Sequence, residues 1–521
     1  MNKITSKKSK EEQSKEIDHG LKLLAKSSMV VFIGLFLSKL FTYGYKIIIA
    51  RWFGPDDYGV FSLSIMVLSW FVAIFSFGFA DGLVRYIPLY RNKEGSNKIR
   101  YLYRITTGIM IFSGIISGIL LYFLADFISI NLFHSQELII YLKIFAFIIP
   151  FYILANIFLA VIQGYEKISA YSFISNILQN FMKIFFLLFF IFIGLKGNAI
   201  IFSTFLGIFS MFLAGYLICK RKLPEIFLGY DINEDVKKSI RKDFISYSWP
   251  IFFLSIATFI FSWTDSFFVG YFMDPASVGL YNAAFTVAAL MGFVPELFRQ
   301  LFLPLITREY SNKNFEVIKQ LSKQSAKWIF MMNLPVFIIL FTYPGLILHI
   351  LFGQEYVSSY NALRILSVAG IFSCLTLLLT NMILMTGRSK VILSNLLVFS
   401  FLNILLNIFL VPLYGINGAA ISTTLATVGM SMALFIEVRY YTGIIPLRTK
   451  MLNILLVSII PAAIVIFLRR FIENSAINII FTGLFFILSY FCLLLLTNSF
   501  DRNDWMILKA IKSKILVSRN K

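Results

Sequence analysis

The sequence predicts an all-α membrane protein whose chain crosses the bilayer about fourteen times. Of its 521 residues, 59% are hydrophobic and 14% are charged, and the mean hydropathy is +0.81. A soluble chain of this length would need a far more polar surface. Apolar stretches of roughly 20 residues, enough to cross about 30 Å of hydrocarbon as helices, recur along the whole chain. They lack the alternation of polar and apolar residues that membrane β-barrel strands show.

Turn residues and charge clusters separate these stretches from one another. The predicted spans are 27–50, 60–90, 101–130, 137–164, 168–194, 198–219, 245–271, 278–304, 327–351, 358–386, 390–411, 415–441, 448–470 and 477–498. The predicted organisation is a cytoplasmic N-terminal tail at 1–26, a first six-helix bundle at 27–219, a cytoplasmic linker at 220–244, a second six-helix bundle at 245–441, two additional C-terminal helices at 442–498 and a basic cytoplasmic tail at 499–521. The first hydrophobic run is too long for the core of a signal peptide, so we expect a retained first span.

Positive charge is distributed unevenly between the two sides of the predicted spans. The formal net charge is +21, and most of the 47 lysine and arginine residues lie in the termini and in alternate loops. Because cytoplasmic loops are enriched in lysine and arginine, we predict a multi-pass protein of the plasma membrane with both termini in the cytoplasm. The high charge is then mainly a topology signal, and nucleic-acid binding is the weaker interpretation.

Two stretches 220 residues apart share one pattern, a hydrophobic run interrupted by a short turn. They are IIIARWFGPDDYGVFSLS (47–64) and FFVGYFMDPASVGLYNAA (267–284). A second pair of similar stretches, GLKGNAIIFST (194–204) and YGINGAAISTT (414–424), is also separated by 220 residues. This predicts an internal repeat of two equally oriented halves, although Gly-Pro turns also recur by chance in helical bundles. The predicted external hinge turns contain Gly54, Pro55, Gly59, Pro275 and Gly279.

Seven cations fall inside predicted spans, where a lipid-facing lysine or arginine costs roughly 2.5–3.5 kcal/mol. They indicate a polar interior that favours an anionic substrate, since ammonium and guanidinium groups match phosphate oxygens. For Lys143, near the outer end of its span, anchoring at the interface is the better interpretation. The predicted cationic cavity consists of Lys39, Lys46, Arg85, Lys183, Arg299 and Arg364.

Polar side chains accompany these cations at helical spacings. Asn176, Asn180 and Lys183 share one face of a helix. Asn403 and Asn407 form a similar stripe at the equivalent place in the second half. We predict that these four asparagines line the cavity. For Lys39 and Lys183, structural pairing inside the bundle is the alternative to a cavity-lining role.

Three carboxylates are candidates for coupling transport to Na⁺ or H⁺. They are Asp265, Asp81 and Glu296. Asp265 is the best of them because serine and threonine residues share its helical face, although pairing with Lys46 or Lys39 is an equal alternative. For the other two, a salt bridge to the arginine one turn later in the same helix is the alternative.

No pattern in the sequence indicates catalysis. The three cysteines and three histidines are scattered, so neither a disulfide framework nor a metal site is predicted. No hydrophilic loop exceeds about 25 residues, and none contains a P-loop or a nucleophile motif. We therefore predict no enzyme and no cofactor.

Several motifs resemble one transporter family. IARWFGPDDYGVFSLS followed by FGFADGLVRYIPLY resembles the first hairpin of the polysaccharide-transport (Wzx-type) branch of the MOP exporter superfamily. NALRILSVAGIF (361–372), MTGRSK (385–390) and VPLYGINGAAISTTLA (411–426) resemble its landmarks in the second half. The resemblance implies a MATE-like, V-shaped pair of six-helix bundles with extra C-terminal helices and alternating access.

The same resemblance implies which cations line the cavity. In the similar lipid II flippases, arginines on the first, second and eighth helices do so. By position, Lys39 and Lys46 would stand on the first helix, Arg85 on the second and Arg299 on the eighth. Lysine in place of arginine on the first helix removes the forked geometry and implies a different head group.

The predicted function is that of a flippase for a polyprenyl-(pyro)phosphate-linked oligosaccharide. The partners are this lipid-linked substrate, membrane lipids and the glycan assembly machinery, and we expect a monomer. The alternative is a multidrug or cation antiporter of the related MATE branch, which would depend on a carboxylate such as Asp265. A membrane-embedded glycan ligase or polymerase is less favoured because the external loops are short. The glycan, the carrier lipid and the coupling ion stay open.

Overall fold

The computed structural model is entirely helical over the residues that it describes. These are 2–91, 95–195, 197–468, 476–497, 499 and 504, with the backbone alone at 2–35, 300–301, 468 and 476–480. Within them, twelve helices are long and apolar enough to cross a membrane, and a shorter apolar helix covers Phe481–Leu496. The prediction of an all-α multi-pass membrane protein is confirmed, whereas the structure gives twelve candidate spans instead of about fourteen.

The difference in number arises at the two ends of the chain. The predicted spans 27–50 and 60–90 both begin within α1 (Asn2–Phe75), whose apolar part Phe36–Phe75 counts as one candidate of 40 residues. At 1.5 Å per residue this part is about 60 Å long, twice the thickness of the hydrocarbon layer, and it is interrupted at Gly54. The predicted span 477–498 falls on α17 (Ala476–Leu496), and its described apolar part is too short to count. The predicted basic tail at 499–521 lies outside the described residues except for Ser499 and Asp504.

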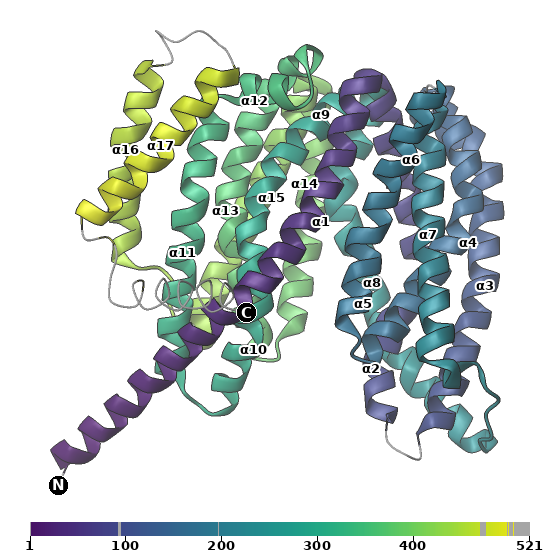
Figure 1. The fold of residues 1–521 in the computed structure, drawn as a ribbon, viewed down its shortest axis with the longest axis horizontal. Coiled ribbons are helices and arrows are strands. Elements are labelled where there is room, and N and C mark those ends of the chain that lie inside the picture. The colour runs from purple at the N-terminus through teal and green to yellow at the C-terminus, as the bar shows by residue number, and fades with distance from the viewer. Residues whose placement is uncertain are drawn as a thin grey trace. The chain divides into compact units, whose positions relative to one another are not determined.

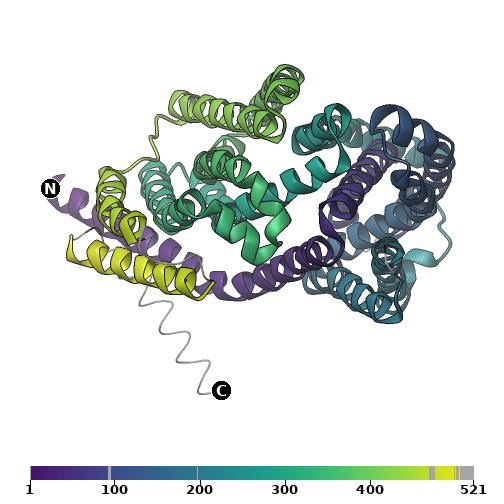
Figure 2. The same cartoon turned by 90° about the horizontal axis from the view of Figure 1, so that it is seen from above.

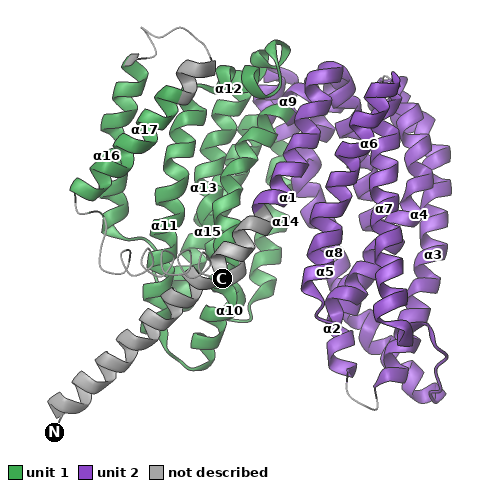
Figure 3. Cartoon of the chain, viewed as in Figure 1, with its two compact units in different colours: residues 1–35, 283–406, 420–521 green, residues 36–282, 407–419 purple. Residues whose placement is uncertain are grey.

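The chain divides into two compact units, which are coloured separately in Figure 3. Unit 2 comprises residues 36–282 and 407–419, and unit 1 comprises 1–35, 283–406 and 420–521. Unit 2 therefore contains residues from both predicted repeats. The predicted bundles 27–219 and 245–441 stay a prediction.

Unit 2 is built around helices from the first half of the chain. Its elements are α2 (Phe79–Tyr90), α3 (Ser96–Phe127), the π-helix η1 (Ile128–Leu132), α4 (Glu137–Gly164), α5 (Ile168–Ser172), the π-helix η2 (Phe173–Leu178), α6 (Gln179–Ile193), α7 (Asn198–Lys222), the 3₁₀-helix η3 (Pro224–Phe227) and α8 (Glu234–Phe272). In Figure 1, α3, α4 and α7 lie side by side, and α6 packs against α7.

Unit 1 contains most of the later helices. Its elements are the 3₁₀-helix η4 (Ala289–Gly292), α10 (Phe293–Ser311), α11 (Phe315–Thr342), α12 (Pro344–Leu351), the 3₁₀-helix η5 (Gln354–Ser359), α13 (Tyr360–Met385), α16 (Thr449–Leu468) and α17. Four helices contribute residues to both units: α1, α9 (Pro275–Ala288), α14 (Ser389–Tyr414) and α15 (Ile416–Thr442). Figure 2 shows α16 and α17 running side by side, and both pack against α11.

The two similar turns found in the sequence interrupt helices by different local means. Gly54 has φ 85° and ψ −179°, a conformation that only glycine adopts without strain, and Pro55 restarts the helix without needing a backbone N–H. At the second turn, α8 ends at Phe272 and α9 begins at Pro275. There the Oδ1 of Asp274 accepts a hydrogen bond of 2.7 Å from the backbone N–H of Ser277, which caps the new helix.

The helices that follow the two turns pack against each other in unit 2 through a reciprocal contact. A Cβ added to Gly59 of α1 would lie 1.7 Å from the carbonyl oxygen of Pro275, and one added to Gly279 of α9 would lie 2.1 Å from that of Pro55. Each glycine is four residues after its proline, so the contact has the same form from either side. Membrane helices use small residues in this way to bring backbones close together. A duplicated hairpin predicts such a symmetric contact.

The second pair of similar stretches also has a common local structure. Gly194, which ends α6, has φ 87°, and Gly415, which follows α14, has φ 57°. A left-handed glycine is a frequent end of a helix. Ala199 and Ala419, in the first turns of α7 and α15, are both fully buried.

Candidate functional site

Contacts between two helices of unit 2 place Lys46 and Lys183 in the same part of that unit. Lys46 lies on α1 and Lys183 on α6, and both side chains are half-buried. The Nζ of Lys183 lies 6.0 Å from the centroid of the Tyr45 ring. Lys46 and Lys183 repel each other electrostatically, and so do Lys39 and Lys46. Three positive charges therefore act on one another in this part of unit 2.

Contacts from α1 to α6 and α7 hold these lysines in place. The Tyr45 hydroxyl forms hydrogen bonds of 3.0 Å with Ser203 Oγ and 2.9 Å with Thr204 Oγ1, in which either atom could be the donor. The rings of Phe41 and Phe181 meet edge to face with their centroids 6.1 Å apart. These contacts join the helices that carry the two lysines, α1 and α6, and connect α1 to α7.

A glycine of α7 leaves room for the long side chain of Lys183. A Cβ added to Gly207 would lie 2.3 Å from Lys183 Cγ and 3.3 Å from its Cε. The aliphatic part of the lysine therefore packs directly on the backbone of α7. This packing limits the conformations of the side chain and directs where its ammonium group lies.

The helix that carries Lys183 begins with an irregular turn. Asn176 lies in the π-helix η2, a form that is frequent at functional sites. Asn180 Nδ2 donates a hydrogen bond of 3.0 Å to Asn176 O, and Asn176 Nδ2 donates one of 3.3 Å to Ser172 Oγ. Both amides thus donate within their own helix, and their role as cavity lining stays a prediction.

Lys39 and Lys183 differ in their surroundings from Lys143, the cation predicted to be an anchor. Lys39 Nζ lies 5.9 Å from the ring centroid of Tyr43, one turn further along α1. Among the described residues, the ion pairs include neither Lys39 nor Lys183. Lys143, in contrast, pairs with Asp126 at 2.9 Å, as suits an anchor. A surplus of positive charge is the main electrostatic feature of this candidate site.

Arg85 of α2 is exposed and stacks on an aromatic side chain of α8. Its guanidinium carbon lies 4.1 Å from the ring centroid of Tyr247 and 6.0 Å from that of Tyr86. The intrahelical salt bridge to Asp81, considered from the sequence, does not occur among the ion pairs of the described residues. The close approach of the two helices has a cause in Gly82, where a Cβ would lie 2.5 Å from Phe244. In this arrangement the face of the guanidinium contacts the ring, so that the N–H groups in its plane can donate hydrogen bonds to other groups.

The remaining predicted cations, Arg299 and Arg364, belong to unit 1. Arg299 donates from Nε and Nη2 to the two carboxylate oxygens of Glu296, at 2.8 and 2.7 Å. The local salt bridge considered from the sequence is therefore present, and it occupies both groups. Arg364 lies in α13, beside a pocket described below.

Asp265 of α8 is buried and accepts hydrogen bonds from two other helices of unit 2. The Tyr281 hydroxyl of α9 donates to its Oδ2 at 2.6 Å, and Asn407 Nδ2 of α14 donates to its Oδ1 at 3.0 Å. Asn403, also buried, donates at 3.3 Å from Nδ2 to Thr423 Oγ1 in unit 1. The two asparagines predicted as one polar stripe thus make contacts in different units. The ion-coupling role of Asp265 stays a prediction.

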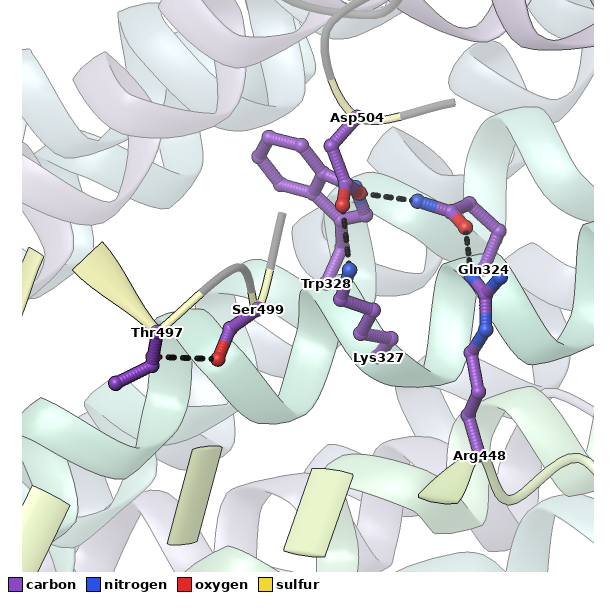
Figure 4. A network of polar contacts seen from close by, with 7 residues as sticks. All are labelled: Gln324, Lys327, Trp328, Arg448, Thr497, Ser499 and Asp504. Atoms are coloured by element: carbon purple, nitrogen blue, oxygen red, sulfur yellow. Dashed lines mark hydrogen bonds and ion pairs between the residues drawn. The ribbon is translucent and has the colours of Figure 1, made fainter. Parts of the chain in front are cut away.

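A buried polar network in unit 1 was not predicted from the sequence. Lys327 and Asp504 form an ion pair with no exposed side-chain surface, and Asp504 also accepts hydrogen bonds from Gln324 and, at 2.8 Å, from Trp328 Nε1. Arg448 donates to Gln324 Oε1 at 2.6 Å (Figure 4). The only signal in the sequence is that carboxylates occur in an otherwise basic C-terminal segment.

Loss of Asp504 is expected to destabilise the protein by about 3–5 kcal/mol, because Asp504→Ala leaves a buried ammonium group without its counter-charge. Two N–H donors, from Gln324 and Trp328, would also lose their acceptor. We expect Lys327→Met/Asp504→Asn to recover most of the stability, since the amide oxygen still accepts and no buried charge remains. Thermal unfolding in detergent measures this. Equal melting temperatures for Asp504→Ala and Lys319→Met, which removes an exposed ion pair with Glu316, would contradict it.

The described residues contain no cluster of three histidine, cysteine, aspartate or glutamate side chains that could hold a metal ion. Cys219 and Cys374 are buried free thiols, and Cys492 is exposed and free.

Many apolar helices, together with lysines inside the predicted spans, are typical of one class of protein, the multi-pass membrane transporters. Two solved structures share this fold. One, "Lipid II flippase MurJ, inward closed conformation", has a TM-score of 0.72 and 18% identity, over 89% of this chain and 98% of that one. The other, an inward-facing multidrug resistance MATE family transporter of the MOP superfamily, has a TM-score of 0.62 and 15% identity, over 78% and 94%. At these identities the likeness shows the fold alone.

The family follows from the sequence comparisons. Residues 24–308 match the family described as "Polysaccharide biosynthesis protein", and residues 250–409 match the family MatE. The chain belongs to the polysaccharide biosynthesis protein family. A relative from Shigella flexneri named "Putative O-antigen transporter" is 25% identical over 394 residues, which cover 73% of this chain and 89% of that protein. The resemblance inferred from the motifs is thereby confirmed.

Proposed function

We propose that this protein flips a polyprenyl-(pyro)phosphate-linked oligosaccharide from the cytoplasmic to the outer leaflet for surface polysaccharide or glycoprotein biosynthesis. The observation that carries the proposal is the group of lysines in unit 2. Lys183 Nζ lies 6.0 Å from the ring centroid of Tyr45, the neighbour of Lys46 in the chain, and the like charges of Lys46 and Lys183 repel each other. An anionic ligand between or beside them would relieve that repulsion. Phosphate oxygens are suited to ammonium groups, which act as point charges.

The proposed mechanism is alternating access between the two leaflets. The phosphate would bind at the lysines while the glycan occupies the polar interior and the isoprenoid tail stays in the lipid. Arg85, stacked on Tyr247, is placed in this proposal as a further contact for the anionic head group. By the positive-inside rule, both termini lie in the cytoplasm. The proposal takes the protein to work in the plasma membrane as a monomer.

Complementation of a strain that lacks its own glycan-lipid flippase tests the proposal. Restored surface glycan on expression of this chain is the expected result. The relative named as an O-antigen transporter makes such strains the natural hosts, and a panel with different glycans guards against a mismatch in the sugar. Accumulation of lipid-linked glycan in the cytoplasmic leaflet across the whole panel, at normal protein levels, would refute flipping.

A MATE-type antiporter is the second candidate function. Its support is the match of residues 250–409 to the MatE family, a range that includes the buried Asp265. It predicts resistance to cationic drugs on expression, with no rescue of surface glycan. The excess of lysines and arginines over carboxylates among the predicted site residues favours the flippase, because a cation carrier needs a binding site of the opposite sign.

We further propose that Asp265 couples flipping to the movement of Na⁺ or H⁺. Asp265→Asn keeps the shape and one acceptor oxygen for Tyr281 or Asn407 but removes the charge. We expect normal protein levels and a glycan export that no longer responds to Na⁺ or to a protonophore. Asp126→Asn, whose carboxylate pairs with Lys143, is the matched control and should keep the native response. A native response in Asp265→Asn would exclude this coupling role.

A further inference from the structure

A pocket of about 430 Å³ lies in unit 1, apart from the lysines of unit 2. It is formed by α12, η5 and the start of α13, and α12 lies at the end of unit 1 opposite the turn between α10 and α11 (Figure 1). The lining side chains that matter here are Tyr343, His349, Gln354, Val357, Tyr360 and Arg364. Its volume is in the range of small-molecule sites, roughly 300–1,000 Å³.

The walls of the pocket are fixed by the local backbone and by the two C-terminal helices. Gly353 has φ 116°, which lets the chain reverse between α12 and η5, and its N–H donates to the carbonyl oxygen of His349 at 3.0 Å. The Tyr343 hydroxyl donates to the Val465 carbonyl oxygen of α16 at 3.1 Å. Tyr343 and Val465 also share a small core with Phe486 of α17. The additional helices thus support one wall of the pocket.

Arg364 is held in a defined orientation at the edge of this pocket. Its Nε donates to the Phe341 carbonyl oxygen at 3.1 Å, and its guanidinium carbon lies 5.5 Å from the Phe341 ring and 5.8 Å from the Tyr360 ring. None of the residues that line the pocket is an aspartate or glutamate. The described residues offer its two NH₂ groups no further hydrogen bond or ion pair. This arrangement presents two donors to an incoming anion.

The other lining groups are suited to more than a bare anion. The rings of Tyr343 and Tyr360 offer apolar faces, while Gln354 and His349 offer a neutral amide and an imidazole for hydrogen bonding to hydroxyl groups. A sugar ring has C–H faces and hydroxyl edges that match such a set. We propose that this pocket binds an acidic sugar unit, a saccharide bearing a carboxylate or a phosphate group, with Arg364 as its anion-binding residue.

The pocket has a place in transport, and this part rests on the proposed function. In the proposed topology it opens at the outer face, where a translocated glycan emerges. An acidic unit of the glycan bound here would hold the sugar chain on the outer side while the lipid-linked end leaves the cationic site. The pocket would thus recognise the glycan itself, whereas the lysines of unit 2 recognise the phosphate of its carrier.

Binding to the purified protein in detergent tests the site without any flipping. Calorimetry or ligand-observed NMR would compare glucuronate and glucose 6-phosphate with glucose and with inorganic phosphate at constant ionic strength. We expect the two acidic saccharides to bind, and Arg364→Gln to weaken them at least tenfold. Arg388→Gln is the matched control, because Arg388 also stacks on a tyrosine, Tyr441, at 4.2 Å but does not line the pocket.

Three results would overturn the proposal. One is no binding of either acidic saccharide up to about 10 mM. Another is binding of inorganic phosphate as tight as that of the saccharides, which would leave only an anion site. The third is unchanged binding in Arg364→Gln with an unaltered melting temperature. These experiments measure binding alone and do not depend on flipping. If complementation fails but the saccharides still bind, the flippase proposal is rejected and the binding site is retained.

The side of the membrane is tested separately. The variant His349→Cys should react with a membrane-impermeant maleimide on intact cells. Labelling of the native chain measures the background reaction of its own cysteines, Cys219, Cys374 and Cys492. Reaction only after permeabilisation would place the pocket on the cytoplasmic side and overturn its role in holding the emerging glycan.

Discussion

Gly59→Ala is expected to prevent the protein from reaching its native packing. The added methyl group would lie 1.7 Å from the carbonyl oxygen of Pro275, and that neighbour is backbone, which cannot rotate away as a side chain can. The whole of α9 would have to move from α1. Overpacking in a tight core costs typically 1–3 kcal/mol, and here the displacement of two helices adds to it. We expect little folded protein after detergent extraction, as measured by fluorescence-detected gel filtration and thermal unfolding.

The reciprocal form of the contact gives a second, sharper expectation. Gly279→Ala, whose methyl group would lie 2.1 Å from the Pro55 carbonyl oxygen, acts on the same interface. Once the two helices are separated by one methyl group, the second costs less, so the double variant should lose less stability than the sum of the single losses. Gly108→Ala is the control, because a Cβ there meets nothing within 4 Å. Strict additivity, or a Gly59→Ala protein as stable as Gly108→Ala, would contradict the contact.

The sequence predicted helices well because hydropathy, proline and glycine act locally. The breaks at Gly54 and before Pro275 follow from backbone rules that need no knowledge of the rest of the fold. The salt bridge between Glu296 and Arg299 is local in the same sense, since three residues in a helix bring the two side chains together. Each of these features could be read from a window of a few residues.

Contacts between helices could not be predicted in this way. The pattern offered Asp81, one turn away, as an alternative partner for Arg85, whereas the aromatic ring on which Arg85 stacks is that of Tyr247, more than 150 positions along the chain. Asp504 offered no periodic signal that would place it beside Lys327. Periodicity identifies which face of a helix is polar, while the choice of the neighbouring helix depends on packing that is spread over the whole fold.

The lysines of unit 2 are an intermediate case. Lys183 was recognised from the sequence as a charge that lipid would not tolerate, and its helical face with Asn180 was visible. Its proximity to Lys46 was not, because the two lie on helices that are separated by more than 100 residues. Like charges brought together are unfavourable for folding, so their arrangement indicates a role in binding.

Lys183→Met is expected to reduce glycan export about 10- to 100-fold, because a charge-assisted contact to phosphate contributes about 1.5–3 kcal/mol. Methionine keeps an unbranched side chain that can still pack on Gly207, so the change removes the charge with little loss of contact. Export of lipid-linked glycan in the complemented strain, normalised to protein level, measures the effect. Lys183→Arg keeps the charge and should retain more activity than Lys183→Met. Lys143→Met is the matched control, since Lys143 also lies in a span but pairs with Asp126.

Stability separates a binding role from a structural one. If Lys183 served only the fold, Lys183→Met would lower the melting temperature along with export. Because the ammonium group is repelled by Lys46 and is poorly solvated between helices, we expect the melting temperature of Lys183→Met to stay the same or rise while export falls. Full export at normal protein level, or export that falls only in proportion to lost stability, would remove Lys183 from the substrate site. If Lys183→Met is more stable but less active than the native protein, the charge of Lys183 serves substrate binding at a cost in stability.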